Sequence, residues 1–199
     1  MEFRQMTPRE VEYWYAAEFS PAFAENERKP LPDILALAAQ GRYELWGLFD
    51  GTDMLGYATL WKRRGIPLVL LDYLGVSARL RNGGLGGGIL ARLRAQGFPI
   101  VTESELPVAG DSDAENDIRL RRIGFYRRNG FLPAYEMATC GMRWQALLAN
   151  SEGLELADIM VWHKALYGPE RTDVKVPLEP GEVPEMPYWM KKRGPITEA

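Results

Sequence analysis

The sequence is poor in the residues that build disulfides, metal clusters and hydrolase triads. It contains one cysteine, Cys140, and one histidine, His163, among 199 residues. No internal disulfide and no cysteine metal cluster can form, which is typical of proteins from reducing compartments. A lone histidine without a supporting motif argues against a hydrolase triad. We therefore expect no bound metal, and a surface or packing role for His163.

Long apolar runs and an excess of positive charge are missing as well. The segment Met1 to Arg4 lacks the apolar run of a signal peptide, and no stretch approaches the ~18 residues that span a bilayer. The net charge of -3 argues against nucleic acid, because phosphate binding needs a basic excess or a basic face. We expect a soluble cytoplasmic protein without a membrane or nucleic-acid partner. Composition leaves open whether it is a monomer or a homodimer.

The order of predicted elements indicates an α+β fold. Apolar residues make up 46% of the chain and charged residues 26%, as in globular domains. Three strand-like runs at 43–49, 54–62 and 68–76 are joined by short turn signals, which predicts an antiparallel meander. The run 68–76 is almost wholly apolar, which predicts a strand buried on both faces.

Local signals predict where two helices begin or end. The quartet Thr7-Pro8-Arg9-Glu10 contains a capping box and predicts the start of a helix that runs to about Phe19. The pair Asn129-Gly130 predicts the end of a helix that begins at about Glu115.

The full pattern of predicted elements reads β-α-α-β-β-β-α-β-α-β-β. It predicts a mixed, mostly antiparallel sheet with helices packed on it.

The chain changes character after residue 150. Residues 1–150 carry the predicted α+β domain, and residues 151–199 carry one amphipathic helix at 154–167 and a tail. Six prolines fall between Pro169 and Pro195. We expect this tail to be extended and pinned by Tyr188-Trp189-Met190.

Glycines cluster in the first turn of a predicted helix. Gly84, Gly86, Gly87 and Gly88 lie there, although each glycine costs ~1 kcal/mol relative to alanine inside a helix. Glycines at a helix N-terminus let a phosphate approach the free N–H groups and the positive end of the dipole. Arg81 can add a charge-assisted bond. The alternative is a plain loop followed by close packing of helix on sheet.

Two other phosphate-binding motifs fit this segment less well. A Walker loop needs Gly-Lys-Ser/Thr, and the sequence contains no such tripeptide. A dinucleotide fingerprint can be forced onto Gly86-x-Gly88-x-x-Ala91, but Val76 ends its strand well upstream of Gly86. A nucleotide-binding oxidoreductase is therefore a minor alternative.

Two sequence blocks resemble the GNAT superfamily of N-acetyltransferases. The segment Val76 to Leu90 is similar to the family's cofactor motif, a strand followed by Arg/Gln-x-x-Gly-x-Gly and a helix, with Arg81, Gly84 and Gly86 at its defining positions. The block Phe125 to Phe131 resembles the family's Tyr-x-x-x-Gly-Phe signature. The two blocks stand in the family's order and spacing. The resemblance covers roughly residues 1–150.

The resemblance implies the acyl-CoA N-acyltransferase fold with acetyl-CoA as acyl donor. In that fold the sheet would splay between Leu68–Val76 and Phe98–Ser104, which frees backbone groups for the pantetheine arm and the thioester oxygen. The cofactor contacts implied are Leu74, Gly75, Val76, Arg81, Asn82, Gly83, Gly84, Leu85, Gly86 and Gly87.

One position departs from the family pattern. Many members carry asparagine seven residues before the signature tyrosine, where it contacts pantetheine, and this sequence has Arg119 there. Arg119 either contacts the cofactor in another way or pairs with Glu115 one turn earlier on the helix.

The resemblance and the chemistry of thioester aminolysis together point to catalytic residues. Tyr126 is the expected acid for the departing sulfur, because a tyrosine with a pKa of ~10 holds its proton at neutral pH. A role as a plain core aromatic is the alternative. Glu103 and Glu105 are the expected bases, slightly ahead of Asp72, which lies in an apolar strand where an unpaired charge is costly. The spacing of Glu103 and Glu105 predicts that they share one face of a strand.

We therefore expect an N-acetyltransferase that moves an acetyl group to a primary amine by direct attack in a ternary complex. The sequence does not select the acceptor among small amines and peptide amines. A non-catalytic acyl-CoA-binding module is the alternative from another class.

Overall fold

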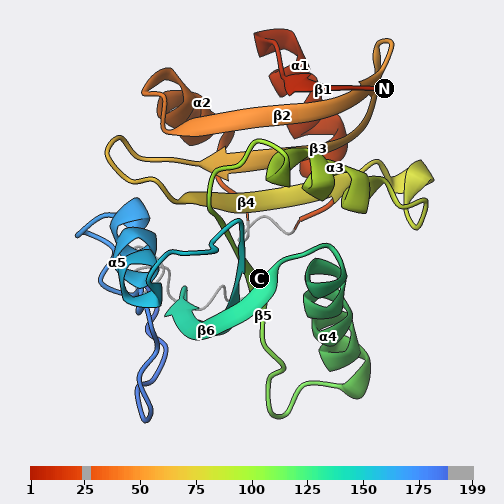
Figure 1. The fold of residues 1–199 in the computed structure, drawn as a ribbon. Coiled ribbons are helices and arrows are strands. Elements are labelled where there is room, and N and C mark those ends of the chain that lie inside the picture. The colour runs from red at the N-terminus through yellow and green to blue at the C-terminus, as the bar shows by residue number, and fades with distance from the viewer. Residues whose placement is uncertain (24–27, 188–199) are drawn as a thin grey trace, which may run out of the picture. The chain divides into compact units, whose positions relative to one another are not determined.

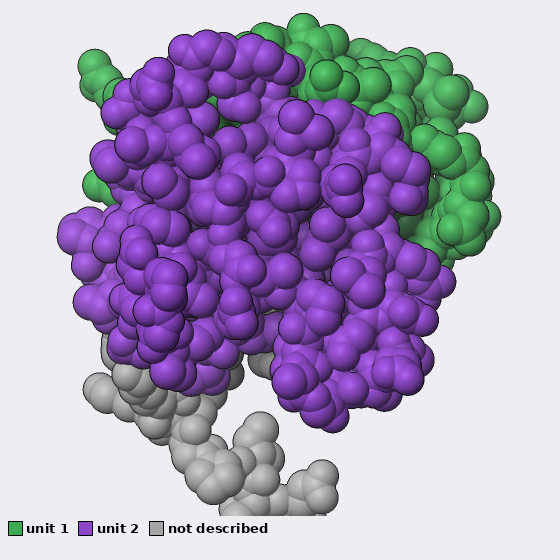
Figure 2. Space-filling model, turned by 60° about the horizontal axis from the view of Figure 1, so that its bottom comes forward, with its two compact units in different colours: residues 1–100 green, residues 101–199 purple. Residues whose placement is uncertain are grey.

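The computed structural model describes residues 1–23 and 28–187 of the chain. They form two compact units, residues 1–100 and 101–199, which Figure 2 colours separately. The predicted division of the chain at residue 150 into a domain and a tail stays a prediction. The predicted anchor Tyr188-Trp189-Met190 lies outside the described residues.

The first unit is built on an antiparallel meander, as predicted (Figure 1). Its strands are β1 (Glu2–Gln5), β2 (Tyr43–Asp50), β3 (Asp53–Trp61) and β4 (Val69–Val76), and each pairs antiparallel with the next. Its helices are α1 (Pro8–Tyr13), the π-helix η1 (Trp14–Phe19), α2 (Leu31–Ala39), the 3-10 turn η3 (Ala78–Leu80) and α3 (Leu85–Arg94).

The first helix begins at a capping box. The Thr7 side chain accepts from the Glu10 N–H, and the Glu10 carboxylate accepts from the Thr7 N–H at 2.7 Å. The helix changes to π geometry at Trp14, where a regular α-helix was expected to continue to Phe19. Trp14 and Phe19 are fully buried and their rings stack 4.6 Å apart, so η1 anchors this side of the sheet.

Strand β4 contains one extra residue opposite β3. Thr59 is paired with Tyr73, whereas Leu60 is paired with Leu71, so Asp72 has no partner in this register. Such a β-bulge bends the strand and re-aims a side chain. The expectation that β4 is buried on both faces is correct for Val69 to Leu71, but residues 72–76 are only half-buried.

The second unit combines a hairpin with two helices. Its strands are β5 (Ile100–Glu105), β6 (Leu132–Thr139) and β7 (Met142–Ala149), with β7 between the other two, and its helices are α4 (Asp113–Arg128) and α5 (Leu156–Tyr167). A capping box of Ser112 and Glu115 begins α4. The predicted C-terminal stop at Asn129-Gly130 is confirmed. Beyond α5, Lys175 exchanges two backbone hydrogen bonds with Ala138 of β6, so this part of the tail is extended.

None of the helices in the described ranges combines the length and apolarity that a bilayer-spanning helix needs.

The substitution Gly75→Ala tests how closely β3 and β4 pack. A Cβ atom at Gly75 would overlap the ring of Tyr57, which is 1% exposed and held by an edge contact with Trp14. Because that ring cannot swing away, we expect the free energy of unfolding to fall by about 1–3 kcal/mol in urea denaturation. Gly88→Ala is the control, since its Cβ meets only the mobile guanidinium of Arg92 at 3.3 Å. Equal losses in both variants would contradict the packing argument.

Candidate functional site

The glycine-rich turn connects η3 to the N-terminus of α3. Gly84 is the N-cap residue and has φ 79°, a left-handed conformation that favours glycine. Asn82 also has a positive φ, 66°. No side chain caps α3, and residues 81–84 are exposed. The first N–H groups of this helix are therefore presented to solvent without a side-chain acceptor, which suits an anionic ligand.

A buried hydroxyl lies beside the end of β4. Tyr57 Oη is inaccessible to solvent and has no hydrogen-bond partner among the described residues, and it would overlap a side chain at Gly75. Burial raises the pKa of Tyr57, the charge of Glu18 raises it further, and Arg81 opposes the rise. The Tyr57 hydroxyl thus keeps its proton beside residues 74–76. An orphaned donor next to an open glycine turn fits a ligand with carbonyl, amide and phosphate groups, such as acyl-CoA.

Asp72 holds an ammonium group of the same unit. Lys29 Nζ lies 2.7 and 3.0 Å from its two carboxylate oxygens, and Tyr43 Oη lies 2.5 Å from one of them. Tyr43 Oη also lies 2.8 Å from Thr59 Oγ1. Burial and the charge of Asp72 raise the pKa of Tyr43 well above its usual range. Tyr43 therefore remains a hydrogen-bond donor to Asp72.

Tyr126 lies in α4, and its role as general acid stays a prediction. Its ring makes edge contacts with Phe125 and Phe131 at 5.4 and 5.8 Å, as a core aromatic would. Burial raises the pKa of Tyr126, while a hydrogen bond with Thr102 of β5 and the charge of Arg122 act against the rise. The residue keeps its proton at neutral pH, which a general acid requires.

Glu103 belongs to a buried polar network. Its carboxylate accepts from Tyr167 Oη at 2.7 and 2.8 Å, and one oxygen lies 2.9 Å from His163 Nε2. The other imidazole nitrogen, Nδ1, lies 2.8 Å from Tyr135 Oη. If the histidine is neutral, Nε2 donates to Glu103 and Tyr135 donates to Nδ1. The chain of bonds joins β5, β6 and α5.

His163 has the packing role that was expected as one of two possibilities, and it also makes hydrogen bonds that the sequence did not predict. The histidine is fully buried within this network. Tyr167, which also binds the Glu103 carboxylate, lies four residues after it in the sequence. That spacing places both side chains on one side of α5 and was the available signal. Its partners Glu103 and Tyr135 are distant in sequence, so no local pattern could reveal them.

Glu105 and Arg119 form a second charged cluster, and it differs from the expected one. Arg119 lies 3.1 Å from Glu105 and 2.7 Å from Asp111, and it also donates to Asn116. The expected ion pair with Glu115 is not made, because the Glu115 carboxylate accepts instead from the N-cap Ser112. Arg119 therefore ties the segment before α4 to the end of β5.

The three candidate bases thus have three separate sets of partners. Asp72 contacts Lys29 and Tyr43, Glu103 contacts α5, and Glu105 contacts α4. Glu103 and Glu105 bind side chains from different helices, and their placement on one face of the strand stays a prediction. The splay between residues 68–76 and 98–104 stays a prediction.

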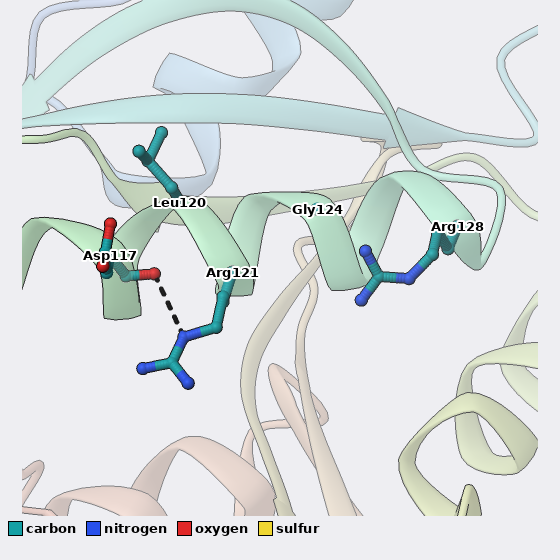
Figure 3. Close-up of a pocket in the computed structure, with 5 residues that line it drawn as sticks. All are labelled: Asp117, Leu120, Arg121, Gly124 and Arg128. Carbon is teal, nitrogen blue, oxygen red and sulfur yellow. Dashed lines mark hydrogen bonds between the residues drawn. The ribbon is translucent and has the colours of Figure 1, made fainter.

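An open hollow of about 550 Å³ lies along α4 (Figure 3). Its lining comes from Asp117, Leu120, Arg121, Gly124 and Arg128. Arg121 Nε donates to the Asp117 carbonyl within the same helix at 3.3 Å. The hollow contains none of the predicted catalytic residues. Among residues 1–23 and 28–187, no group of three or more His, Cys, Asp or Glu side chains is arranged to hold a metal ion.

Comparison with known proteins links this geometry to acetyltransferases. The chain is similar to YjbC of Bacillus subtilis, a protein assigned as an acetyltransferase, with 33% identity over 94 residues. The match covers 47% of this chain and 44% of that protein, so the chain aligns with less than half the length of this relative. No family model matches the sequence.

Solved structures show the fold. A protein of Bacteroides thetaiotaomicron assigned to the GNAT acetyltransferases superposes with a TM-score of 0.63 at 23% identity, over 82% of this chain and 95% of that one. An aminoglycoside 6'-N-acetyltransferase complexed with coenzyme A gives 0.53 at 11% identity, over 74% and 96%. A chimera of the spermidine N-acetyltransferase SpeG from Vibrio cholerae and hSSAT gives a TM-score of 0.58 at 10% identity, over 78% of this chain and 100% of that one. The predicted α+β fold of the GNAT acyltransferases is therefore confirmed.

The substitution His163→Ala tests the buried network. It would leave the Glu103 carboxylate and the Tyr135 hydroxyl without a shared partner in a buried position. We expect the free energy of unfolding to fall by about 2–4 kcal/mol, because unpaired buried polar and charged groups carry their full desolvation cost. Denaturant unfolding measures this loss. His163→Gln, which keeps a donor and an acceptor, should lose clearly less, and equal losses would mean that only the ring volume matters.

Proposed function

We propose that this protein is an N-acetyltransferase that moves an acetyl group from acetyl-CoA to a primary amine. The observation that carries the proposal is the exposed, uncapped glycine turn with Arg81 at the N-terminus of α3, in a chain with the GNAT fold. The orphaned Tyr57 hydroxyl beside residues 74–76 supports it. The structural neighbours include enzymes named for acting on spermidine and aminoglycosides, which are amines.

The residues that would hold acetyl-CoA are those of the turn and of the end of β4. Asn82 to Gly87 would bind the phosphates through backbone N–H groups, with Arg81 adding a charge-assisted bond. Leu74 to Val76 would bind the pantetheine arm through backbone groups. When bound, acetyl-CoA supplies an acetyl group activated as a thioester.

Tyr126 would act as the general acid. Its role is to donate the hydroxyl proton to the sulfur as the carbon–sulfur bond breaks and the carbon–nitrogen bond forms. Burial supports this role, because it keeps the proton on the hydroxyl until a strong base develops next to it.

A carboxylate would take the proton that the amine loses. Glu103, Glu105 and Asp72 remain the candidates, and their partners distinguish them. Glu105 lies between Arg119 and Arg122, at 3.1 and 3.9 Å. Glu103 accepts from Tyr167 Oη and lies 2.9 Å from His163 Nε2, so its carboxylate belongs to a network of hydrogen bonds. Asp72 already contacts an ammonium group, the chemical form in which an amine arrives.

A second candidate function is a non-catalytic acyl-CoA-binding module. One observation favours it: each candidate carboxylate already has partners within the protein. Binding of acetyl-CoA without turnover across a panel of amines would support this candidate over the enzyme.

Calorimetric titration with acetyl-CoA tests the cofactor site. We expect saturable binding that Arg81→Glu weakens by about 10- to 100-fold, because a charge-assisted bond to phosphate is replaced by repulsion. Arg79→Glu is the matched control, since Arg79 is exposed and lies 3.7 Å from Asp53. A dinucleotide should bind neither protein. Absence of acetyl-CoA binding to the unmodified protein would refute the proposal.

Steady-state kinetics of Tyr126→Phe tests the acid. We expect kcat to fall by about 10²- to 10⁴-fold while the Kd for acetyl-CoA is unchanged, since the ring and its packing are retained. Because the pKa of Tyr126 is raised above its ordinary ~10, its deprotonation should not reduce kcat below about pH 10. Tyr13→Phe, which removes an exposed hydroxyl, is the control. An unchanged kcat in Tyr126→Phe would leave the tyrosine as a core aromatic.

A further inference from the structure

The ammonium group of Lys29 lies in a box of aromatic and acidic side chains. Its Nζ contacts both oxygens of Asp72 at 2.7 and 3.0 Å. The same nitrogen lies 4.7 Å from the centre of the Trp61 ring, 5.2 Å from that of Tyr73 and 6.0 Å from that of Tyr43. We call Asp72, Tyr43, Trp61 and Tyr73 the ammonium box.

The ammonium box is built by one side of the meander. Tyr43 and Trp61 are directly paired across β2 and β3, so their side chains lie on the same face. The bulge in β4 brings Asp72 and its neighbour Tyr73 to the same ammonium, although adjacent residues of a regular strand point to opposite faces. The Tyr43 hydroxyl donates to the Asp72 carboxylate and lies 2.8 Å from Thr59 Oγ1, so Thr59 orients the Tyr43 hydroxyl.

The box is matched to an alkylammonium ion. A carboxylate supplies the counter-charge, and aromatic faces attract a cation and cover its methylene groups, as in the aromatic cages that bind amine ligands. Lys29 itself shows the fit, because its side chain is a primary ammonium on an unbranched four-carbon stem. A carboxylate next to the amine, as in a free amino acid, would be repelled by Asp72.

The ion pair of Lys29 and Asp72 is only partly buried. The side chain of Lys29 is 24% exposed and that of Asp72 is 14% exposed, so solvent reaches the pair. Ion pairs near the surface stabilise proteins little. The backbone of Lys29 is held separately, because Tyr15 Oη donates to its carbonyl at 3.1 Å. The side chain can therefore leave the box while its backbone stays in place.

We propose that the ammonium box binds the ammonium group of an unbranched primary alkylamine acceptor, and that Lys29 occupies the box until such an amine displaces its side chain. The acceptor role rests on the proposed acetyltransferase function. The binding of an alkylammonium ion does not depend on it. Asp72 is then a residue that binds and positions the acceptor, two residues before the strand segment proposed to hold pantetheine.

Binding of n-propylammonium to Lys29→Ala tests the box without acetyl-CoA. This ion replaces the atoms that the substitution removes, and calorimetry in an amine-free phosphate buffer measures its Kd. We expect at least roughly tenfold tighter binding to Lys29→Ala than to the unmodified protein, where the lysine competes. Neutral n-propanol should not bind, and Asp72→Asn added to Lys29→Ala should abolish the effect. Equal affinity in both proteins, or equal binding of propanol, would overturn the inference.

Kinetics with n-butylamine at saturating acetyl-CoA tests the acceptor role. Lys29→Ala should lower the KM for the amine, and Asp72→Asn in the otherwise unmodified chain should raise it roughly tenfold, with the Kd for acetyl-CoA unchanged. Lys29→Arg, which keeps a cation in the box, should not lower the KM. If Lys29→Ala does not unfold cooperatively, the Asp72→Asn variant alone decides, and an unchanged KM in that variant would overturn the acceptor role.

The outcomes separate this inference from the function on which it rests. Turnover of amines with a KM that neither Lys29→Ala nor Asp72→Asn changes would overturn the acceptor role and leave the acetyltransferase intact. Tight binding of propylammonium to Lys29→Ala without any turnover would support the box as a cation site and overturn the enzyme.

Discussion

The chemistry of the first unit depends on one extra residue in strand β4. With strict alternation, Asp72 and Tyr73 would point to opposite faces of the meander. The bulge removes that restriction, so both residues reach the Lys29 ammonium. Beyond the bulge, the strand runs past the buried Tyr57 hydroxyl and ends before the glycine turn. Asp72, the residues of β4 next to the Tyr57 hydroxyl and the uncapped N-terminus of α3 thus follow one another along a single short segment.

The features that the sequence predicted well are those set by neighbouring residues. The capping box at Thr7, the meander and the stop at Asn129-Gly130 each follow from residues a few positions apart, and all three are confirmed. The bulge could not be predicted, because β4 is an almost continuous apolar run without the alternation that a register shift would disturb. The switch to π geometry at Trp14 has no sequence signal that we recognise.

The partners of the charged residues could not be predicted either, because they are set by contacts between distant parts of the chain. Glu103 contacts His163 and Tyr167, which lie some 60 residues later in the chain. Arg119 forms ion pairs with Glu105 and Asp111 and none with Glu115, which is one helical turn away. Helical spacing made Glu115 the simplest partner, but its carboxylate is already used by the N-cap, since a cap satisfies backbone groups that have no other acceptor. Competition of this kind is decided by three-dimensional packing.

The same competition limits the choice of a base. A carboxylate that already receives hydrogen bonds must release a partner before it can accept a proton from an amine. For Glu105 that partner is a guanidinium and for Glu103 it is an imidazole or a phenol, and neither resembles an incoming substrate. For Asp72 the partner is a primary ammonium, so an amine acceptor can replace it group for group and leave every other bond of the carboxylate unchanged. Replacing one primary ammonium with another costs the least free energy, because the carboxylate keeps its charge partner. This is the physical reason for placing the acceptor at Asp72.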